Sequence, residues 1–188
     1  MMKKLLIILA VSLLVVPVGA VAKDPKFDSV SGRARNRMER EVRHELVMLP
    51  YYGVFDNLAF KVDRGVVTLM GQVSRPTLKT DAERVVQGIE GVERVINQIE
   101  VLPLSPYDDR IRLATYRSIY GHPALNRYAL QAVPPIHIIV KNGQVTLEGV
   151  VNNELERNVA GMRASTAGLS FGPVQNNLRV ENPKSKKS

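Results

Sequence analysis

The sequence contains no cysteine. Disulfide bonds, thiolate metal sites and lipid attachment through a processed N-terminal cysteine are therefore excluded. Histidine is scarce as well, and His44, His122 and His137 do not have the spacing of a metal-ligand motif. We therefore expect neither a metal nor a cofactor.

Motifs for catalysis are also missing. No Gly-x-Ser-x-Gly sequence occurs, and Ser165 and Ser170 have no base close to them in the sequence. Gly88 and Gly91 are not followed by Gly-Lys-Ser/Thr, so we expect them at a helix exit rather than in a phosphate loop. The sequence favours a protein that is not an enzyme.

Long apolar runs are absent too. The apolar segment 5–16 is shorter than the roughly 20 residues of a spanning helix. It follows Lys3 and Lys4 and precedes Ala20-Val21-Ala22, which is the order of an export signal. We expect cleavage of residues 1–22 after Ala22 and a periplasmic mature protein. An uncleaved N-terminal anchor is the alternative.

The charge is positive and unevenly distributed. The net charge of +8 falls to +6 when the two lysines of the signal are removed. Residues 108–182 carry eight Lys/Arg against six Asp/Glu, and the tail 183–188 adds three lysines, whereas residues 42–107 carry seven against eight. This bias favours an anionic partner, lipid headgroups or cell-wall polymer rather than nucleic acid. Plain solubility is the alternative. The basic segment 23–37 and the tail are expected to be flexible.

Two stretches of the chain are nearly identical. Residues 62–73 match residues 140–151 at a constant offset of 78, and the match resumes downstream after a one-residue slip. The shared residues are mostly turn and packing types: Gly65 and Gly143, Gly71 and Gly149, and Asn97 and Asn176. A repeat of this length indicates two copies of one small domain rather than a solenoid.

Each copy reads as helix, strand, strand, helix, strand. Gly65 and the Asn142-Gly143 pair mark a hairpin in each copy. Gly71 and Gly149 are expected at a bulge or a close approach, since neither has a side chain. The pattern predicts an α+β fold of two tandem αββαβ units, each with a three-stranded mixed sheet and two helices on one face.

Apolar periodicity locates the helices of both copies. The first helix of the first copy carries Met38, Val42, Leu46 and Leu49. The second helix of the second copy is predicted to bury Leu155, Val159, Met162, Thr166 and Leu169. The predicted domains are 38–102 and 107–182, joined by a linker over 103–106. Ser105 is placed to cap the next helix, with Pro106 at its first position.

The repeated pattern V-x-x-G-x-V-T-L-x-G-x-V, followed by a helix and V-x-N-x-[IL]-x-V, resembles the BON domain. That family is named for bacterial osmotically inducible and nodulation proteins. The resemblance covers residues 38–102 and 107–182 as a tandem pair. It implies an αββαβ fold in each copy, export to the periplasm, and a non-enzymatic role in envelope integrity or osmotic stress. Phospholipid interfaces are the proposed target in much of the family.

The first helix of the second copy provides a candidate lipid-binding face. At about 100° per residue, Leu113, Tyr116 and Tyr120 fall on one side of the helix, opposite Ile111. Arginines border this side at Arg110, Arg112 and Arg117. Aromatic rings at headgroup depth and guanidiniums at phosphates suit a membrane interface. Two alternatives remain: the face packs against the first copy, or only its aromatic residues do and the arginines stay free.

Two loops are further candidates. The aromatic loop 51–55 suits either the lid of a small core or membrane contact. The second copy also inserts about eight residues between first helix and first strand, within 121–135, and loops often carry function.

These patterns together predict a non-enzymatic periplasmic protein. We expect it to bind anionic phospholipid surfaces, mostly through its second copy, and to support envelope integrity. The alternative is an adaptor or scaffold that binds envelope proteins or peptidoglycan.

Overall fold

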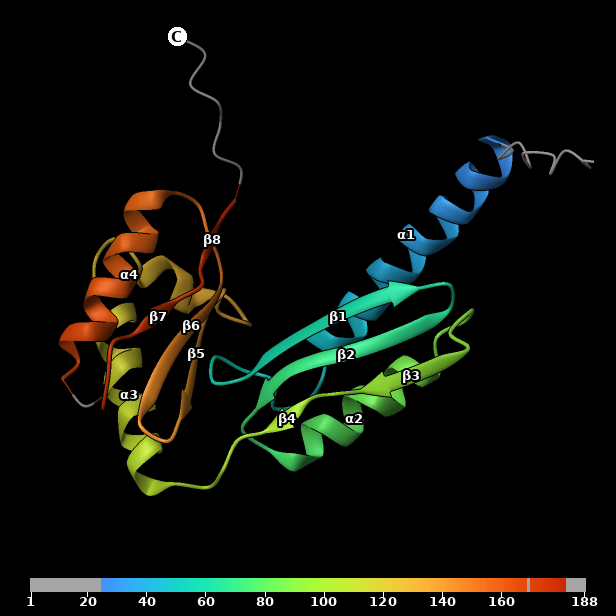
Figure 1. The fold of residues 1–188 in the computed structure, drawn as a ribbon. Helices are drawn as coiled ribbons and strands as arrows, with labels where there is room; N and C mark the ends of the chain where they lie inside the picture. The colour runs from blue at the N-terminus through green and yellow to red at the C-terminus, as the bar shows by residue number, and fades with distance from the viewer. Residues whose placement is uncertain (1–24, 169, 182–188) are drawn as a thin grey trace, which may run out of the picture.

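The computed structural model describes residues 25–168 and 170–181 (Figure 1). The predicted export signal, Leu169 and the basic tail 183–188 lie outside the described residues. The chain forms two units of the same αββαβ order, one after the other, which confirms the predicted fold class (Figure 1).

The first unit consists of α1 (Pro25–Val47), β1 (Asn57–Asp63), β2 (Val66–Val73), α2 (Pro76–Gln87), β3 (Arg94–Asn97) and β4 (Glu100–Val101). Its central strand is β2, which pairs antiparallel with β1 and parallel with both β3 and β4. Alternate strand residues such as Val67 and Leu69 point into the core, together with Val42 of α1 and Ala82 of α2. Both helices therefore cover the same face of the sheet.

The second unit consists of α3 (Pro106–Tyr120), the 3-10 helix η1 (Asn126–Leu130), β5 (Ile136–Lys141), β6 (Gln144–Val151), α4 (Glu154–Thr166), β7 (Gln175–Asn176) and β8 (Arg179–Val180). It repeats the topology, with β6 between β5 on one edge and β7 and β8 on the other. The inserted loop contributes to its core, because Leu125 and Tyr128 are buried there.

Positive φ angles explain the glycines that the two copies share. Asn142 and Gly143 have φ values of 51° and 78°, which is the geometry of a type I′ hairpin turn. A Cβ atom at Gly71 would lie 2.0 Å from the carbonyl oxygen of Asn57, and one at Gly149 would lie 1.9 Å from that of Pro135. The close approach comes from the beginning of the paired strand, so only glycine fits at either position.

The shared asparagines hold the last strand of each unit against a helix. Asn97 donates from Nδ2 to the carbonyl oxygen of Lys79 on α2 at 2.9 Å, and its Oδ1 accepts from the amide of Ile99. Asn176 donates in the same way to the carbonyl oxygen of Arg157 on α4 at 2.8 Å. The short turn at each asparagine divides the closing strand into two segments.

α1 begins earlier than expected. It is helical from Pro25 onward, so most of segment 23–37, expected to be flexible, belongs to the helix. Met38 is where this helix first packs against the first core, and Val42 and Leu46 continue the contact. Figure 1 shows the N-terminal part of α1 projecting beyond the first sheet.

The predicted buried face of α4 is only partly right. Val159 packs against the second core as expected, Leu169 lies outside the described residues, and the other predicted positions are exposed. Leu155 and Met162 are 69% and 56% exposed, and the buried positions are instead Glu156, Ala160 and Ala164. The two alanines let α4 lie close to its neighbours. Ser118 Oγ of α3 donates to the carbonyl oxygen of Arg163 at 2.6 Å. Glu156 is buried because its carboxylate accepts hydrogen bonds from Tyr128 and from the amide of Asn152.

Candidate functional site

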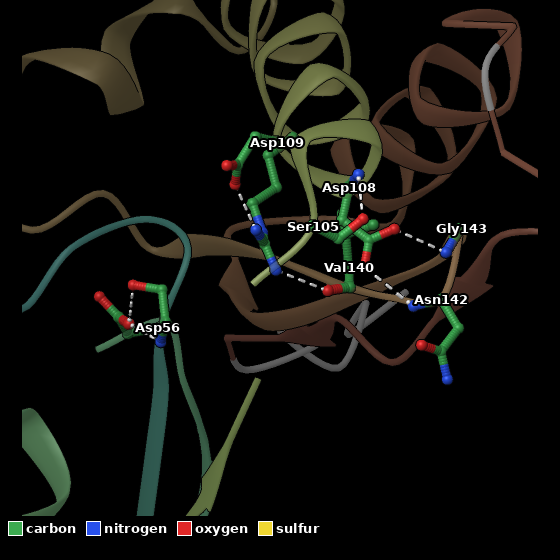
Figure 2. Close-up of polar contacts among 9 residues, drawn as sticks. Asp56, Ser105, Asp108, Asp109, Val140, Asn142 and Gly143 are labelled. Atoms are coloured by element: carbon green, nitrogen blue, oxygen red, sulfur yellow. Dashed lines mark hydrogen bonds and ion pairs between the residues drawn. The ribbon is translucent and has the colours of Figure 1, made fainter. Parts of the chain in front are cut away.

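Helix α3 begins at the predicted cap. Ser105 Oγ accepts a hydrogen bond from the amide of Asp108 at 3.2 Å, and Pro106 occupies the first turn. The carboxylate of Asp108 accepts from the amides of Asn142 and Gly143, as Figure 2 shows. The start of α3 is therefore fastened to the β5–β6 hairpin, which fixes the rotation of the helix on the sheet.

This rotation places Arg112 inside the second unit, so the expectation of an outward Arg112 is wrong. Its side chain is 5% exposed. The guanidinium donates to Asp109 Oδ1 at 2.5 Å and to the carbonyl oxygen of Val140 at 2.8 Å (Figure 2). A buried guanidinium needs such partners because desolvation of an unpaired charge is costly. Arg112 acts as a structural link between α3 and β5.

Tyr120 is buried as well, contrary to the expected outward face. Its hydroxyl donates to the carbonyl oxygen of Ile136 at 2.6 Å. Burial raises the pKa of Tyr120 well above the usual range, with the hydrogen bond to Ile136 opposing the shift. Tyr116 packs on Tyr120 at 4.8 Å between ring centroids, and Phe55 of the first unit meets Tyr116 edge-on at 6.3 Å. Tyr116 therefore follows the alternative expectation for this helix, in which the aromatic face packs against the first copy.

Three of the six candidate residues remain at the surface as one stripe. Arg110, Leu113 and Arg117 follow each other at steps of three and four residues and are exposed. Leu113, which lies between the two guanidiniums, is 47% exposed. Arg110 lies over the ring of Tyr107 at 5.3 Å, and Arg117 makes no ion pair within the described residues. We call these three residues the α3 stripe.

A second set of arginines lies on α1. Arg33, Arg37 and Arg40 are exposed and follow the same spacing of four and three residues. At about 100° per residue they fall roughly opposite the side that Val42 and Leu46 bury in the core. Arg37 and Arg40 make no ion pair within the described part of the chain. The spacing of these arginines is the sequence signal for this face, and two of them lie in segment 23–37, for which flexibility is expected.

The aromatic loop joins the two units. The carbonyl oxygen of Val54 accepts a hydrogen bond from the amide of Ile138 on β5 at 2.8 Å. Val54 and Phe55 also pack against the second core. Asp56 fixes the loop, since its carboxylate accepts hydrogen bonds from the amides of Gly53 and Ser74. This loop is therefore largely an interdomain contact.

His137 and Tyr52 complete this junction. The two rings stack at 5.7 Å, and His137 Nδ1 lies 3.3 Å from the carbonyl oxygen of Gly53. Burial lowers the pKa of His137, while the backbone of Gly53 and the charges of Asp56 and Glu148 oppose the shift. Burial raises the pKa of Tyr52 to about 12. His137 is buried and Tyr52 is half-buried, so the two rings serve mainly as a contact between the units.

Two properties of the described residues bear on what the candidate site can bind. Within residues 25–168 and 170–181, no three His, Asp or Glu side chains lie close enough to hold a metal ion. Among the same residues, none of the helices has the length and apolar character needed to cross a membrane. The exposed arginines of α3 and α1 provide chemistry for binding anions, and on α3 the apolar Leu113 lies beside them.

Two solved structures are similar to this chain. One is described as CdsD, a structural protein of the type III secretion system of Chlamydia trachomatis, with 13% identity over 77% of this chain, a TM-score of 0.30 and 61% of that chain covered. The other is the C-terminal domain of CdsD, with 16% identity over 76% of this chain, a TM-score of 0.27 and 96% of that chain covered. This chain therefore spans about three fifths of the length of the first. No curated protein matches.

The family model for the BON domain matches residues 39–103 and again residues 124–182. The two matches fall on the two αββαβ units and together cover more than half of the chain. They include the hairpin glycines Gly65 and Gly143 and the strand asparagines Asn97 and Asn176, which hold each unit together. The second match begins after α3, so the α3 stripe lies outside it. The chain belongs to the BON domain family, of which it carries two copies.

Proposed function

We propose that this protein is a non-enzymatic component of the bacterial envelope that binds anionic phospholipid surfaces. Membership in the BON family supports an envelope-associated role. The observation that carries the proposal is the α3 stripe, in which Arg110 and Arg117 flank a half-exposed Leu113. Its place is the periplasm, reached through the predicted export signal, and its role there is to support envelope integrity under osmotic stress.

The chemistry of the stripe matches a lipid headgroup layer. A guanidinium presents a planar set of donors that binds two phosphate oxygens at once. Leu113 lies between the guanidiniums and is placed to enter the boundary between headgroups and acyl chains. Each arginine near an anionic leaflet contributes about 1 kcal/mol of attraction. Two arginines on α3 therefore give weak binding, and further cations are needed for stable association.

The arginines of α1 supply those further cations. Arg37 and Arg40 lie on the side of α1 that faces away from the first core. A helix with one basic face and one packed face presents its charges without cost to the fold. Because the attraction is electrostatic, it weakens as salt screens the charges over about 8–10 Å at physiological ionic strength.

Co-sedimentation with liposomes tests this proposal. The protein used is the chain from Lys23, which retains every described residue and omits the predicted signal. We expect the bound fraction to rise with the share of anionic lipid and to fall with added salt. Absence of sedimentation at every lipid composition would contradict lipid binding as a whole.

Charge reversal identifies the surface. The variant Arg110→Glu with Arg117→Glu is expected to lose most binding, and Arg37→Glu with Arg40→Glu to weaken it. The matched control is Arg84→Glu with Arg94→Glu, which makes the same change of net charge at exposed positions of the first unit. If the control variant loses as much binding as the α3 variant, net charge and not the stripe determines the association.

A further inference from the structure

A cleft of about 520 Å³ lies between the two units. One wall is the face of the second sheet that the helices do not cover, where Gln144, Thr146 and Glu148 alternate along β6 with the buried Val145 and Leu147. The other wall is the end of the first sheet, which contributes its residues Gln72, Glu100 and Leu102. The cleft therefore exists only because the two units are held side by side.

The repeat shows that the fold does not require these polar residues. At the offset of 78, Gln144 and Glu148 correspond to Val66 and Met70 in the first unit. After the one-residue slip, Gln175 corresponds to Ile96. The same open sheet face is thus partly apolar in one copy and rich in amides in the other. The same topology accepts both sets, so the fold itself does not require the amides of the second copy.

Hydrogen-bonding capacity in the cleft exceeds what the protein itself uses. Asn177 Nδ2 donates to Glu148 Oε1 at 2.7 Å, and Thr146 Oγ1 reaches Gln175 Oε1 only at 3.5 Å. The side-chain amide of Gln144 has no partner within the described residues. Each side-chain amide offers both donors and an acceptor.

The remaining lining is apolar or charged. Ile139 and Leu102 lie at the cleft but are only 5% and 3% exposed, so little apolar surface is open beside the amides. Lys141 is paired with Glu100 at 2.5 Å across the junction. Glu148 is the other carboxylate, and no second cation lines the cleft. Unlike the α3 stripe, this cleft is therefore not suited to phosphate groups.

We infer that the cleft binds an uncharged saccharide chain. Sugar hydroxyls donate and accept hydrogen bonds, as the side-chain amides of the cleft do. A volume of about 520 Å³ lies within the usual range of about 300–1,000 Å³ for small-molecule sites. This second binding activity is separate from the proposed lipid surface and does not depend on it.

The test is an NMR titration of the chain from Lys23. The probes are a soluble tetramer of N-acetylglucosamine, a tetramer of glucose and an uncharged tetrapeptide. At least one saccharide is expected to shift the amide signals of β6 and β7 with a Kd of about 1 mM or lower, which is typical of a few exposed hydrogen bonds. A response to the N-acetylated chain alone assigns the site to acetamido sugars, and a response to both assigns it to hydroxyl recognition.

A pair of variants locates the binding. Gln144→Val with Gln175→Ile introduces the residues that the first unit carries, and is expected to weaken saccharide binding by roughly tenfold, the equivalent of one or two hydrogen bonds. The control Val66→Gln with Ile96→Gln places amides at the same positions of the first unit and should leave the Kd unchanged. Both variants should sediment with anionic liposomes like the parent chain.

Three results would overturn the inference. The first is no shift with either saccharide at about ten times the expected Kd. The second is an unchanged Kd in the Gln144→Val, Gln175→Ile variant when its urea midpoint shows that it is folded. The third is a titration in which the tetrapeptide shifts β6 and β7 while neither saccharide does, which would make the cleft a peptide site.

Discussion

Asp108 is a single residue that connects two elements. It is 1% exposed, and its carboxylate accepts from the amides of Asn142 and Gly143 at 3.0 and 2.8 Å. Its own amide donates to Ser105 Oγ, so the residue belongs to the helix cap and the hairpin at once. Hydrogen bonds to a charged acceptor stabilise more than neutral ones, and their loss leaves buried amides unpaired.

We expect Asp108→Ala to lower the free energy of unfolding by about 2–4 kcal/mol, because the buried amide of Gly143 and the partly buried amide of Asn142 lose their acceptor. Urea denaturation measures this change. The control Asp63→Ala removes a carboxylate at an exposed hairpin position and should cost less than about 0.5 kcal/mol. Equal effects of the two variants would show that the turn amides of Asn142 and Gly143 do not depend on Asp108.

His137 makes stability depend on pH. Burial lowers its pKa below the usual histidine value of about 6.5, and Asp56 and Glu148 are the charged groups that oppose the shift. The folded protein therefore binds this proton less readily than the unfolded chain. By linkage, the contribution is fully present above about pH 6.5 and is lost as the pH falls below it towards the lowered pKa.

The variant His137→Phe keeps a ring against Tyr52 and removes the titrating group. We expect the urea midpoint of the parent chain to fall between about pH 7.5 and pH 5.5 more than that of the variant. Parallel pH profiles of parent and variant would mean that His137 does not cause the dependence.

Local residue roles were predictable from the sequence, and distant ones were not. Ser105 and Pro106 cap α3 as expected, since capping depends on neighbours a few residues away. Arg112 and Tyr120 were placed on the wrong side because their partners, the carbonyl oxygens of Val140 and Ile136, lie 28 and 16 residues away in the sequence. Nothing in the helical periodicity of α3 indicates those partners.

Among the elements, α4 shows where apolar periodicity fails. The large apolar residues Leu155 and Met162 suggested a buried stripe, yet the helix buries Ala160 and Ala164. Small side chains are selected where helices approach closely, and Ser118 and Arg163 bond across the α3–α4 contact in both directions. The spacing of large apolar residues does not reveal a buried face that is made of small side chains. The strands and hairpins were predicted because their turn residues require positive φ.

Substitutions on two faces of α4 test which face the helix buries. Leu155→Lys and Met162→Lys should each change the free energy of unfolding by less than about 0.5 kcal/mol, since both side chains are exposed. Ala160→Leu should cost about 1–3 kcal/mol because the added carbons have no space. Thermal unfolding measures all three. If Met162→Lys lowered the free energy of unfolding more than Ala160→Leu, the buried face of α4 would be the one predicted from the sequence.

For the whole molecule, the sequence predicted two units but not their arrangement. The repeat shows that each unit is complete, and the four-residue linker over 103–106 shows only that they are close. The arrangement comes from the loop before β1, where Val54 bonds to Ile138 and Phe55 meets Tyr116. Neither pairing is visible in the sequence, because these residues differ between the copies.

Phe55→Ala should loosen the junction without unfolding either unit. Removing a half-buried ring costs about 1–2 kcal/mol of contact between the units. We expect ¹⁵N relaxation to give one correlation time for both units in the parent chain and two different values in the variant. Tyr51→Asn, at an exposed position with φ of 69° that asparagine tolerates, is the control and should retain one correlation time.

The central claim is that the exposed side of α3 meets an anionic lipid surface. It is tested most directly by NMR signal broadening of the chain from Lys23 on anionic bilayer discs that contain a lipid spin-labelled at the headgroup. We predict selective broadening at Arg110, Leu113 and Arg117, with Ile111 and Tyr120 on the buried side less affected. Broadening centred on another surface, with the α3 stripe as sharp as in unlabelled discs, would contradict the account.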